Sequence, residues 1–279
     1  MQFFYNSIAF LPLFVYNVNM FNFIYKNIDF AHKLNGHTTP SDDFHKHMHD
    51  HYELLYLLRG NIDYTIESET KKLVAGEVLM IAPGMLHFGT VDPNSAYERY
   101  VLKFPATVLP EFMLKKIENL KFCGIIPKIQ ELFEELDYIY ANFDDEERNL
   151  LMYTALFRII IRVYKSEMPV FDEQIHHNAI IAEIINYINK NIKRSIALAD
   201  ICQDLHFSKS YISSEFSKEM KTPVMTYIKH KKIIAAHRQI TEGKTRLINV
   251  AEEFGFSEYS TFYRNYKKII GYPPQDGKR

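Results

Sequence analysis

The stretch Leu198-Ala-Asp-Ile-Cys-Gln-Asp-Leu-His-Phe-Ser208 recurs further along the chain as Leu247-Ile-Asn-Val-Ala-Glu-Glu-Phe-Gly-Phe-Ser257, with apolar residues at matching positions. Each copy predicts a short helix and a tight turn, and a second segment with helical periodicity follows it. The serine that ends each copy is expected to be the N-cap of the second helix, because its hydroxyl accepts an N–H that has no partner within the helix. The repeat therefore predicts two helix-turn-helix units.

Four residues inside the copies suit a turn between two closely packed helices. Gly255 supplies the positive φ that such a turn needs, and His206 is among the residues that tolerate it better than most. Cys202 and Ala251 are small where the two helices approach each other, so Cys202 is interpreted as a packed thiol and not as a nucleophile. The alternative is an ordinary helical domain whose self-similarity is coincidental.

A long helix and an excess of positive charge accompany the two units. The periodicity over residues 223–240 predicts a rigid spacer helix, with Lys229, Lys231 and Lys232 around its polar side. Residues 178–279 contain 17 Lys and Arg against 10 Asp and Glu, whereas the whole chain has 33 against 34. A basic segment beside an acidic remainder indicates that this part of the chain meets a polyanion.

This C-terminal segment, residues 178–279, resembles the DNA-binding domain of the AraC/XylS family of bacterial transcription regulators. In the first unit the resemblance rests on residues 198–219, and in the second on Val250-Ala-Glu-Glu-Phe-Gly-Phe-Ser, Thr261-Phe-Tyr-Arg-Asn-Tyr-Lys-Lys and Gly271-Tyr-Pro-Pro. In that family one monomer inserts both recognition helices into successive major grooves of the DNA. The resemblance thus implies a sequence-specific DNA-binding protein.

The resemblance assigns DNA contacts by position to two recognition helices, residues 208–220 and 257–269. Among the base-reading residues only Arg264 can make a bidentate contact to guanine. Two departures from the family are Ser214, where Arg is frequent, and the tail after Pro273, where a shortened last helix is expected. The base-reading residues are expected to be Lys209, Ser210, Ser213, Ser214, Tyr259, Ser260, Tyr263 and Arg264, and the phosphate contacts Lys218, Lys221, Lys267 and Lys268.

Short strands separated by turn residues characterise the chain from about residue 25 to residue 104. Ile62, Tyr64 and Ile66 alternate with polar residues, and the apolar run 78–81 is bounded by turn residues. Several such strands predict an antiparallel β-barrel or sandwich. The fold class expected for the chain is multidomain α+β, with an all-α C-terminal domain.

Two motifs in this β-rich part resemble those of the cupins, and also the sensor domain commonly joined to AraC-type DNA-binding domains. The first is His47-Met-His-Asp-His-Tyr-Glu53 with Gly60, and the second runs from Gly76 to His87. The expected N-terminal domain is therefore a cupin-like ligand-sensing barrel.

The cupin resemblance implies a site formed by His47, His49, Glu53 and His87. Three imidazoles and a carboxylate suit Fe, Mn, Ni or Zn. Because the resembling sensor domains keep this pattern without generally holding a metal, the favoured interpretation is a frame for an organic effector or a structural cluster. Metal binding and a pH-responsive cluster remain as alternatives. Arg59 shares the strand face of Glu53 and is a further pocket candidate for an anionic ligand, unless it forms a surface salt bridge.

Helical periodicity follows from residue 108 to residue 165. Two long amphipathic helices there either cover the sheet or form a subunit contact, and we favour the contact. Pro169 breaks the second helix and begins the expected linker. The expected domains are a ligand-sensing domain (1–107), a dimerisation segment (108–168), a linker (169–177) and a DNA-binding domain (178–279). Residues 1–19 are either an upstream extension, with Met20 as the start, or a first packed segment.

Composition narrows the class of protein further. An apolar content of 47% with 24% charged residues excludes a disordered chain, and two cysteines exclude a disulfide framework or a four-thiolate zinc site. The low cysteine content fits a reducing cytoplasm, where the protein is expected. The apolar runs are too short to span a bilayer, so no membrane contact is expected.

The sequence therefore predicts a transcription regulator and not an enzyme. We expect a ligand-responsive activator that forms a homodimer, binds promoter DNA and a small-molecule effector, and acts with RNA polymerase. The alternative is a metal-dependent cupin enzyme, an oxygenase or isomerase, with an appended DNA-binding domain. The cofactor is left open, with a divalent metal as one possibility.

Overall fold

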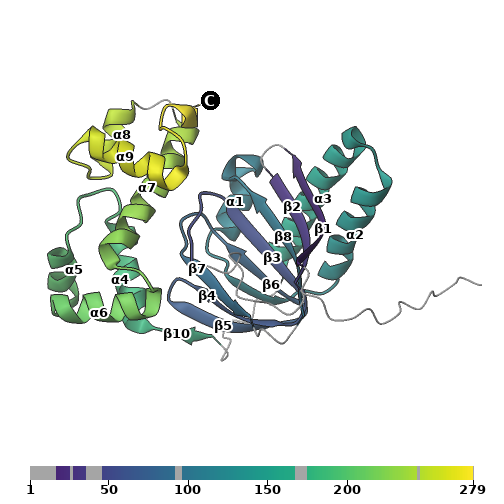
Figure 1. Cartoon of the computed structure of the whole chain (residues 1–279), viewed down its shortest axis with the longest axis horizontal. Helices are drawn as coiled ribbons and strands as arrows, with labels where there is room; N and C mark the ends of the chain where they lie inside the picture. The colour runs from purple at the N-terminus through teal and green to yellow at the C-terminus, as the bar shows by residue number, and fades with distance from the viewer. Residues whose placement is uncertain are drawn as a thin grey trace, which may run out of the picture.

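The computed structural model describes residues 17–25, 28–35, 46–91, 96–166, 175–243 and 246–278. Two lobes are seen in Figure 1. The N-terminal lobe, formed by the described residues up to 166, contains two β-sheets and the helices that cover one of them. The C-terminal lobe, formed by the described residues from 178 onward, is helical. The expected multidomain α+β class is confirmed.

All strand pairs in the described part of the chain are antiparallel. The six-stranded sheet has the order β1-β2-β8-β3-β6-β9, and the four-stranded sheet has the order β10-β5-β4-β7. The strands are β1 (Asn17–Tyr25), β2 (Ile28–Asn35), β3 (Tyr52–Arg59), β4 (Asn61–Ile66), β5 (Glu69–Val74), β6 (Glu77–Ile81), β7 (His87–Val91), β8 (Tyr97–Phe104), β9 (Phe122–Ile125) and β10 (His176–His177).

The space between the two sheets is filled by apolar side chains. On β4 the predicted alternation is confirmed, because Ile62, Tyr64 and Ile66 are buried while Asp63 is exposed. They pack with inward-facing residues of the other strands, among them Leu55, Leu57, Leu73, Leu79, Ile81, Tyr97 and Val101. On the inner face of β3 the buried polar residue is Glu53, at the start of the strand.

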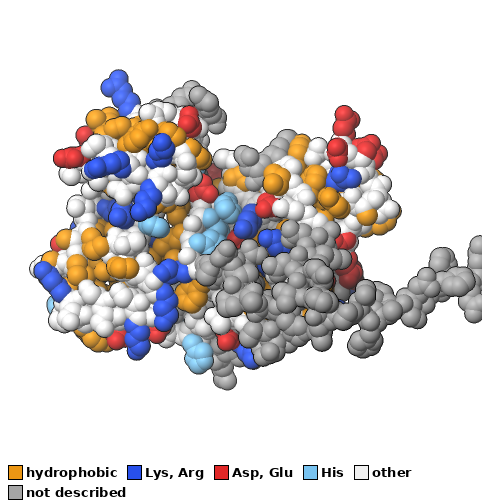
Figure 2. Space-filling view, in the orientation of Figure 1, with side chains coloured by type: hydrophobic (Ala, Val, Ile, Leu, Met, Phe, Trp, Pro, Cys, Tyr) orange, Lys and Arg blue, Asp and Glu red, His pale blue; other side chains and the backbone are white. Residues whose placement is uncertain are grey.

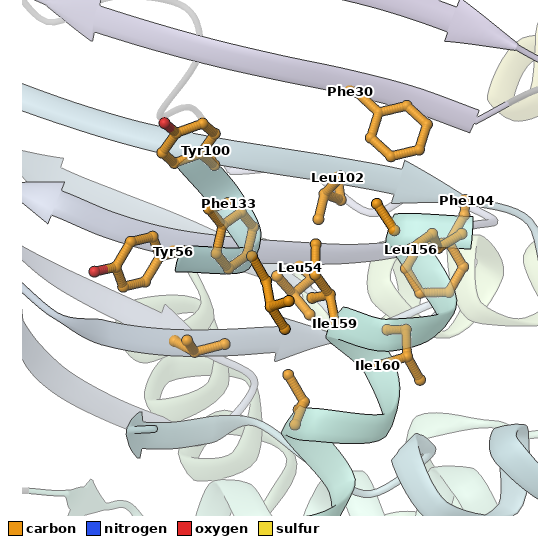
Figure 3. Close-up of a cluster of buried hydrophobic side chains, with 14 of the residues drawn as sticks. Phe30, Leu54, Tyr56, Tyr100, Leu102, Phe104, Phe133, Leu156, Ile159 and Ile160 are labelled. Carbon is orange, nitrogen blue, oxygen red and sulfur yellow. The ribbon is translucent and has the colours of Figure 1, made fainter. Parts of the chain in front are cut away.

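Helices α2 (Ile129–Asn142) and α3 (Asp145–Lys165) cover the outer face of the six-stranded sheet (Figure 1). The Phe133 ring stacks on that of Tyr56 with centroids 4.8 Å apart, and Leu156 and Ile159 are buried in the same core (Figure 3). The apolar faces of both helices are therefore used within the chain. Of the two alternatives drawn from the sequence, the structure therefore shows the one in which these apolar faces cover the sheet, and a subunit contact through the helices stays a prediction.

The expected boundaries also shift in the structure. Helix α1 (Glu111–Ile117) is followed by β9, which pairs with β6, so the sheet continues past residue 107. The end of the expected linker forms β10, which pairs with β5, while Pro169 lies outside the described residues. Residues 17–19 belong to β1, and the rest of the segment 1–19 lies outside the described residues.

The C-terminal lobe has two apolar cores, one around each helix-turn-helix unit. The long helix α7 contributes Tyr227 and Ile228 to the first core and Ile233 and Ile240 to the second. None of the helices in the described part of the chain combines the length and apolar character that crossing a bilayer requires. The helices of this lobe are α4 (Ala179–Lys190), α5 (Leu198–Leu205), α6 (Lys209–Met220), α7 (Val224–Glu242), α8 (Leu247–Glu253) and α9 (Tyr259–Ile270).

Candidate functional site

The first helix-turn-helix unit, α5 and α6, forms as the sequence predicts. His206 ends α5 in the left-handed conformation with φ 58°, as its place in the turn requires. Ser208 is the N-cap of α6, and its Oγ accepts a hydrogen bond from the N–H of Tyr211 at 3.2 Å. Ile212 and Phe216 anchor α6 in the core, so the opposite side of the helix faces outward.

The second unit, α8 and α9, keeps the predicted turn but has a different cap. Gly255 has φ 74°, and a Cβ at this position would lie 2.4 Å from the backbone nitrogen of Ser195. Glycine is therefore required here both by the backbone conformation and by the close approach. The predicted Ser257 cap is wrong: Glu258 is the N-cap residue, and α9 begins at Tyr259. The extra residue before α9 in the second copy moved the start of the helix.

Helix α7 connects the two units as the predicted spacer, but two of its lysines are not on a polar outer face. The Lys232 side chain is buried and donates hydrogen bonds to the backbone carbonyls of Arg194 and Phe254, the latter at 2.8 Å. Lys231 lies 3.3 Å from a carboxylate oxygen of Glu67 in the N-terminal lobe. Lys229 remains exposed. Lys232 thus joins the segment before α5 to the end of α8, which periodicity alone did not indicate.

The predicted DNA contacts lie on α6, at Lys221 directly after it, and on α9. Figure 2 shows Lys and Arg side chains distributed over the visible face of the C-terminal lobe. The Arg264 side chain is exposed, with Nη2 3.4 Å from the hydroxyl of Thr261. Ser213, Tyr259 and Tyr263 are half-buried, and the exposed members are Lys209, Ser210, Ser214, Ser260, Arg264, Lys218, Lys221, Lys267 and Lys268.

A histidine cluster lies at the starts of β3 and β7 in the N-terminal lobe. The structure brings His47, His49, Glu53 and His87 together, with one candidate ligand atom from each within 4.8 Å of the others. His47 and His87 form an isolated antiparallel bridge, and their Nε2 atoms are 3.1 Å apart. The His49 Nε2 is also 3.1 Å from a Glu53 carboxylate oxygen. Figure 2 shows histidine side chains on the surface where the two lobes meet.

Burial and neighbouring charges set the protonation of this cluster. Burial, with the adjacent His49 and His47, lowers the pKa of His87 to about 3. Burial also lowers the pKa of His49, although its hydrogen bond with Glu53 opposes this. Burial alone would raise the pKa of Glu53, but the hydrogen bond from His49 and the charge of Lys103 bring it well below its ordinary value. At neutral pH the His87 ring is thus neutral and the Glu53 carboxylate beside it is ionised.

Arg59 does not join the cluster. Its side chain is 68% exposed, and its Nε lies 3.6 Å from a carboxylate oxygen of Glu98. The pairing of β3 with β8 shifts register between Leu57 and Arg59, so the face alternation counted from Glu53 is broken at this point. Of the two alternatives for Arg59, the structure therefore contains the surface salt bridge, here with Glu98. We do not include Arg59 in the site formed by the histidine cluster.

A contact between the lobes was not predicted from the sequence. Glu67 has φ 56° in the turn between β4 and β5, and its buried carboxylate accepts a hydrogen bond from the Tyr227 hydroxyl, which is 2.8 Å from both oxygens. The N–H of Leu86 donates to the same carboxylate at 3.1 Å. Leu86 itself packs into the core of the first helix-turn-helix unit. The sequence signal for Glu67 was weak, since glutamate rarely adopts positive φ and its partner lies in another domain.

A second polar contact between the lobes lies further along α7. His237 Nε2 is 2.9 Å from an oxygen of the Asp50 carboxylate, and His237 Nδ1 is 2.5 Å from the Tyr266 hydroxyl on α9. A Cβ on Gly84 would lie 3.6 Å from Ile234, between the two polar contacts. Tyr227, Lys231, Ile234 and His237 follow helical spacing, so one face of α7 is turned toward the N-terminal lobe.

Two family models match the chain, the AraC-like ligand binding domain over residues 36–159 and a helix-turn-helix domain over residues 201–279. The uncharacterised HTH-type transcriptional regulator YdiP of Escherichia coli K12 is 23% identical over 84% of this chain and 80% of its own length. The uncharacterised HTH-type transcriptional regulator YobQ of Bacillus subtilis 168 is 26% identical over 83% of this chain and 88% of its own length. Among solved structures, ToxT from Vibrio cholerae O395 matches 90% of this chain and 97% of its own at 12% identity, with a TM-score of 0.38.

Proposed function

Because the chain belongs to the AraC family of transcription regulators, with its ligand-binding and helix-turn-helix domains in that order, we propose that α6 and α9 read two successive major grooves of promoter DNA. The observation that carries this proposal is the pair of helix-turn-helix units fixed to one spacer helix, each with its apolar side in a core and its polar side exposed. The enzyme alternative is not favoured, since the matching domains and relatives are those of regulators.

The two recognition helices carry different base-reading groups. Arg264 on α9 supplies five donors in a planar fork and is the residue suited to a guanine edge. On α6 the exposed groups near the N-terminus are Lys209, whose ammonium group only donates, and Ser210 and Ser214, whose hydroxyls both donate and accept. We therefore propose that α9 supplies most of the sequence discrimination and that α6 contributes less.

Positive charge beside the recognition helices supports phosphate binding. Lys218 and Lys221 lie at the end of α6, and Lys267 and Lys268 lie in the last turn of α9. All four are exposed. Such contacts position the protein on the duplex and make its affinity depend on salt, but they carry no sequence information.

The protein responds to a ligand through its N-terminal lobe, and we propose that it acts as a homodimer that recruits RNA polymerase. Large apolar side chains remain exposed on the helices that cover the sheet, with Tyr138 60% and Leu150 65% exposed. They are available for a second copy of the chain, which would place two pairs of reading helices on one promoter and increase avidity. Activation of transcription fits this arrangement.

Selection of bound duplexes from a random DNA library tests the proposed function. Full-length protein is used at near-physiological salt, and the bound fraction is sequenced over successive rounds. The expected result is a motif with two parts separated by about one helical turn, or 10 base pairs. If the bound duplexes shared no motif, and their binding depended only on the salt concentration, the proposal that the protein recognises a specific sequence would be overturned.

A further inference from the structure

We propose that a cavity at the end of α3 binds a small organic anion, and that this anion is the effector to which the N-terminal lobe responds. The anion has an apolar body and a head group of two negative charges, as in a phosphate monoester. The binding site stands on its own geometry and charge, whereas the effector role rests on the proposed function. The described lining residues include no member of the histidine cluster and none of the polar residues that join the two lobes.

The cavity lies between residues 125–127, the first turn of α2 and the last turns of α3. Its volume is about 760 Å³. Sites for small molecules typically have volumes of roughly 300–1,000 Å³, so the cavity has the size of a ligand site. Its helical walls are held in place, because α2 and α3 are packed on the sheet by buried residues such as Phe133 and Ile159.

One part of the lining is apolar and consists of Ile125, Ile126, Pro127, Leu132 and Ile161. Ile126 and Leu132 are buried and belong to the core beneath the cavity. Ile125, by contrast, is 70% exposed. An exposed apolar patch that is rimmed by polar residues marks a site where a ligand or partner binds. These residues therefore offer a surface to the apolar body of a ligand.

The segment 125–127 is held between two residues in the left-handed conformation, Gly124 with φ 66° and Lys128 with φ 59°. Glycine adopts this conformation without cost, but Lys128 carries a side chain, so its backbone is strained. Such strain persists only where the surrounding structure holds it, and it concentrates at sites that bind ligands. The apolar wall of the cavity is thus a sharply turned segment fixed at both ends.

The other part of the lining is positively charged. Arg158, Arg162 and Lys165 lie on one side of α3, because their spacing of four and three residues follows the helical repeat. Arg158 is paired, since its Nη1 is 2.5 Å and 2.7 Å from the two carboxylate oxygens of Glu135. Arg162 and Lys165 are exposed, and within the described part of the chain no carboxylate pairs with either of them. The cavity therefore has two positive charges that are not compensated.

Two helix ends meet at the cavity, and their dipoles act in opposite directions. The N-terminus of α2 favours an anion, whereas the C-terminus of α3 favours a cation. The side chains therefore decide the charge of the ligand. Arg158 and Arg162 are like charges four residues apart, a spacing at which they repel each other. A dianionic head group beside Arg162 and Lys165 compensates both charges, and a guanidinium binds two oxygens of such a group at once.

The place of the cavity in the chain suits an effector site. Ser166, the C-cap residue of α3, belongs to its lining. After Ser166 the chain passes toward β10 and then α4, the first helix of the C-terminal lobe. An anion bound at the last turn of α3 therefore acts where the covalent connection between the lobes begins.

Isothermal titration calorimetry of full-length protein with naphthyl phosphate tests the site. At about pH 8 this ester carries close to two negative charges, because the second pKa of such a phosphate group is about 6. We expect saturable binding of one molecule per chain, and binding at least about tenfold weaker for the uncharged naphthol and for inorganic phosphate. The Arg162→Ala/Lys165→Ala variant, altered at two exposed positions, should also bind naphthyl phosphate at least about tenfold more weakly.

Two further variants serve as controls for charge and for apolar contact. The Lys72→Ala/Lys116→Ala variant removes two exposed lysines of the same lobe and should bind naphthyl phosphate as the wild type does. Ile125→Ser keeps every charge and should lose about fivefold in affinity. Equal affinity of the two double variants, or binding that does not saturate, would overturn the site. Naphthoate binding as tightly as naphthyl phosphate would overturn the dianionic head group.

Fluorescence anisotropy with a labelled selected duplex tests the effector role. Saturating naphthyl phosphate should change the affinity of the wild type for DNA about fivefold or more. The Arg162→Ala/Lys165→Ala variant should bind the duplex as the wild type does without the ester, and should lose the response to it. Normal binding of the ester with unchanged DNA affinity would overturn the effector role and leave the site. Normal binding of the ester without any selected duplex would instead overturn the proposed function, and the effector role with it.

Discussion

The imidazole of His237 lies between Asp50 and Tyr266, with Nε2 2.9 Å from the Asp50 carboxylate and Nδ1 2.5 Å from the Tyr266 hydroxyl. A carboxylate accepts hydrogen bonds, so Nε2 carries the hydrogen and Nδ1 accepts from the hydroxyl. Asp50 belongs to the N-terminal lobe, His237 to the spacer helix and Tyr266 to the second recognition helix. The three side chains thus connect the N-terminal lobe to the helix α9, for which we propose a role in reading DNA.

The contact between Tyr227 and Glu67 should contribute measurably to stability. Tyr227→Phe removes the hydroxyl from a buried carboxylate, and leaving such a group short of partners costs about 1–3 kcal/mol. We expect the free energy of unfolding in urea to fall by this amount. Tyr138→Phe, which changes a 60% exposed tyrosine on α2, is the matched control and should change it little. Equal stability of the two variants would show that the carboxylate does not depend on Tyr227.

Alanine substitutions at Gly271 and Gly255 distinguish the cost of backbone strain from the cost of a steric clash. Gly271→Ala places a Cβ in open space at φ 95°, so it should cost only the strain of roughly 1–2 kcal/mol. Gly255→Ala adds a Cβ 2.4 Å from the Ser195 nitrogen and 2.6 Å from the Arg194 carbonyl carbon, in addition to φ 74°. Thermal and urea unfolding should therefore show a clearly larger loss for Gly255→Ala. Similar losses would mean that the segment at Ser195 moves aside without cost.

His32 predicts a pH dependence within the N-terminal lobe. Burial lowers its pKa, but hydrogen bonds and charges from Asp137 and Glu98 outweigh this and raise the pKa above its ordinary value. A raised pKa in the folded state means that the contribution to stability is complete below the unfolded value of about 6.5 and is lost as the pH rises through the folded value. The difference in unfolding free energy between wild type and His32→Gln should thus shrink as the pH rises from about 6. A difference that grows with pH would contradict the assignment.

Arg264 and Lys268 should affect DNA binding in different ways. Arg264→Ala should relax the preference at one base position, with a loss of about 1–3 kcal/mol on the best sequence and little on others. Lys268→Ala should weaken binding to all sequences alike and reduce the salt slope by about 0.9. Affinities for a panel of single-base variants, measured at several salt concentrations, distinguish the two. A uniform loss for Arg264→Ala would remove it from the base-reading set.

Local sequence signals predicted the helix-turn-helix units well. The Ser208 cap and the positive φ angles of His206 and Gly255 depend only on neighbouring residues in the chain. The residue types at these positions were therefore enough to predict the local conformation. Ser257 failed as a cap because one extra residue precedes α9, and nearby Glu258 fills the position. Which residue caps a helix depends on where the helix begins, and the comparison of the two sequence copies fixes the start of α9 only to within one residue.

The remaining differences arise from tertiary contacts. Periodicity predicted the apolar faces of α2 and α3, but only the fold shows that Phe133 packs on Tyr56 of the sheet. The cluster of His47, His49, Glu53 and His87 was predicted from motif spacing, and the strand pairing brings it together. Asp50–His237 and Glu67–Tyr227 join residues far apart in the sequence, and the residue types alone do not indicate such partners.

Hydroxyl-radical footprinting of a selected duplex with full-length protein tests the central claim most directly. If α6 and α9 enter successive major grooves, each monomer should protect two stretches of backbone on one face of the duplex, about 10 base pairs apart. Arg264→Ala should weaken the stretch beside α9 before the other. A single protected stretch per monomer would contradict the claim that both units read DNA.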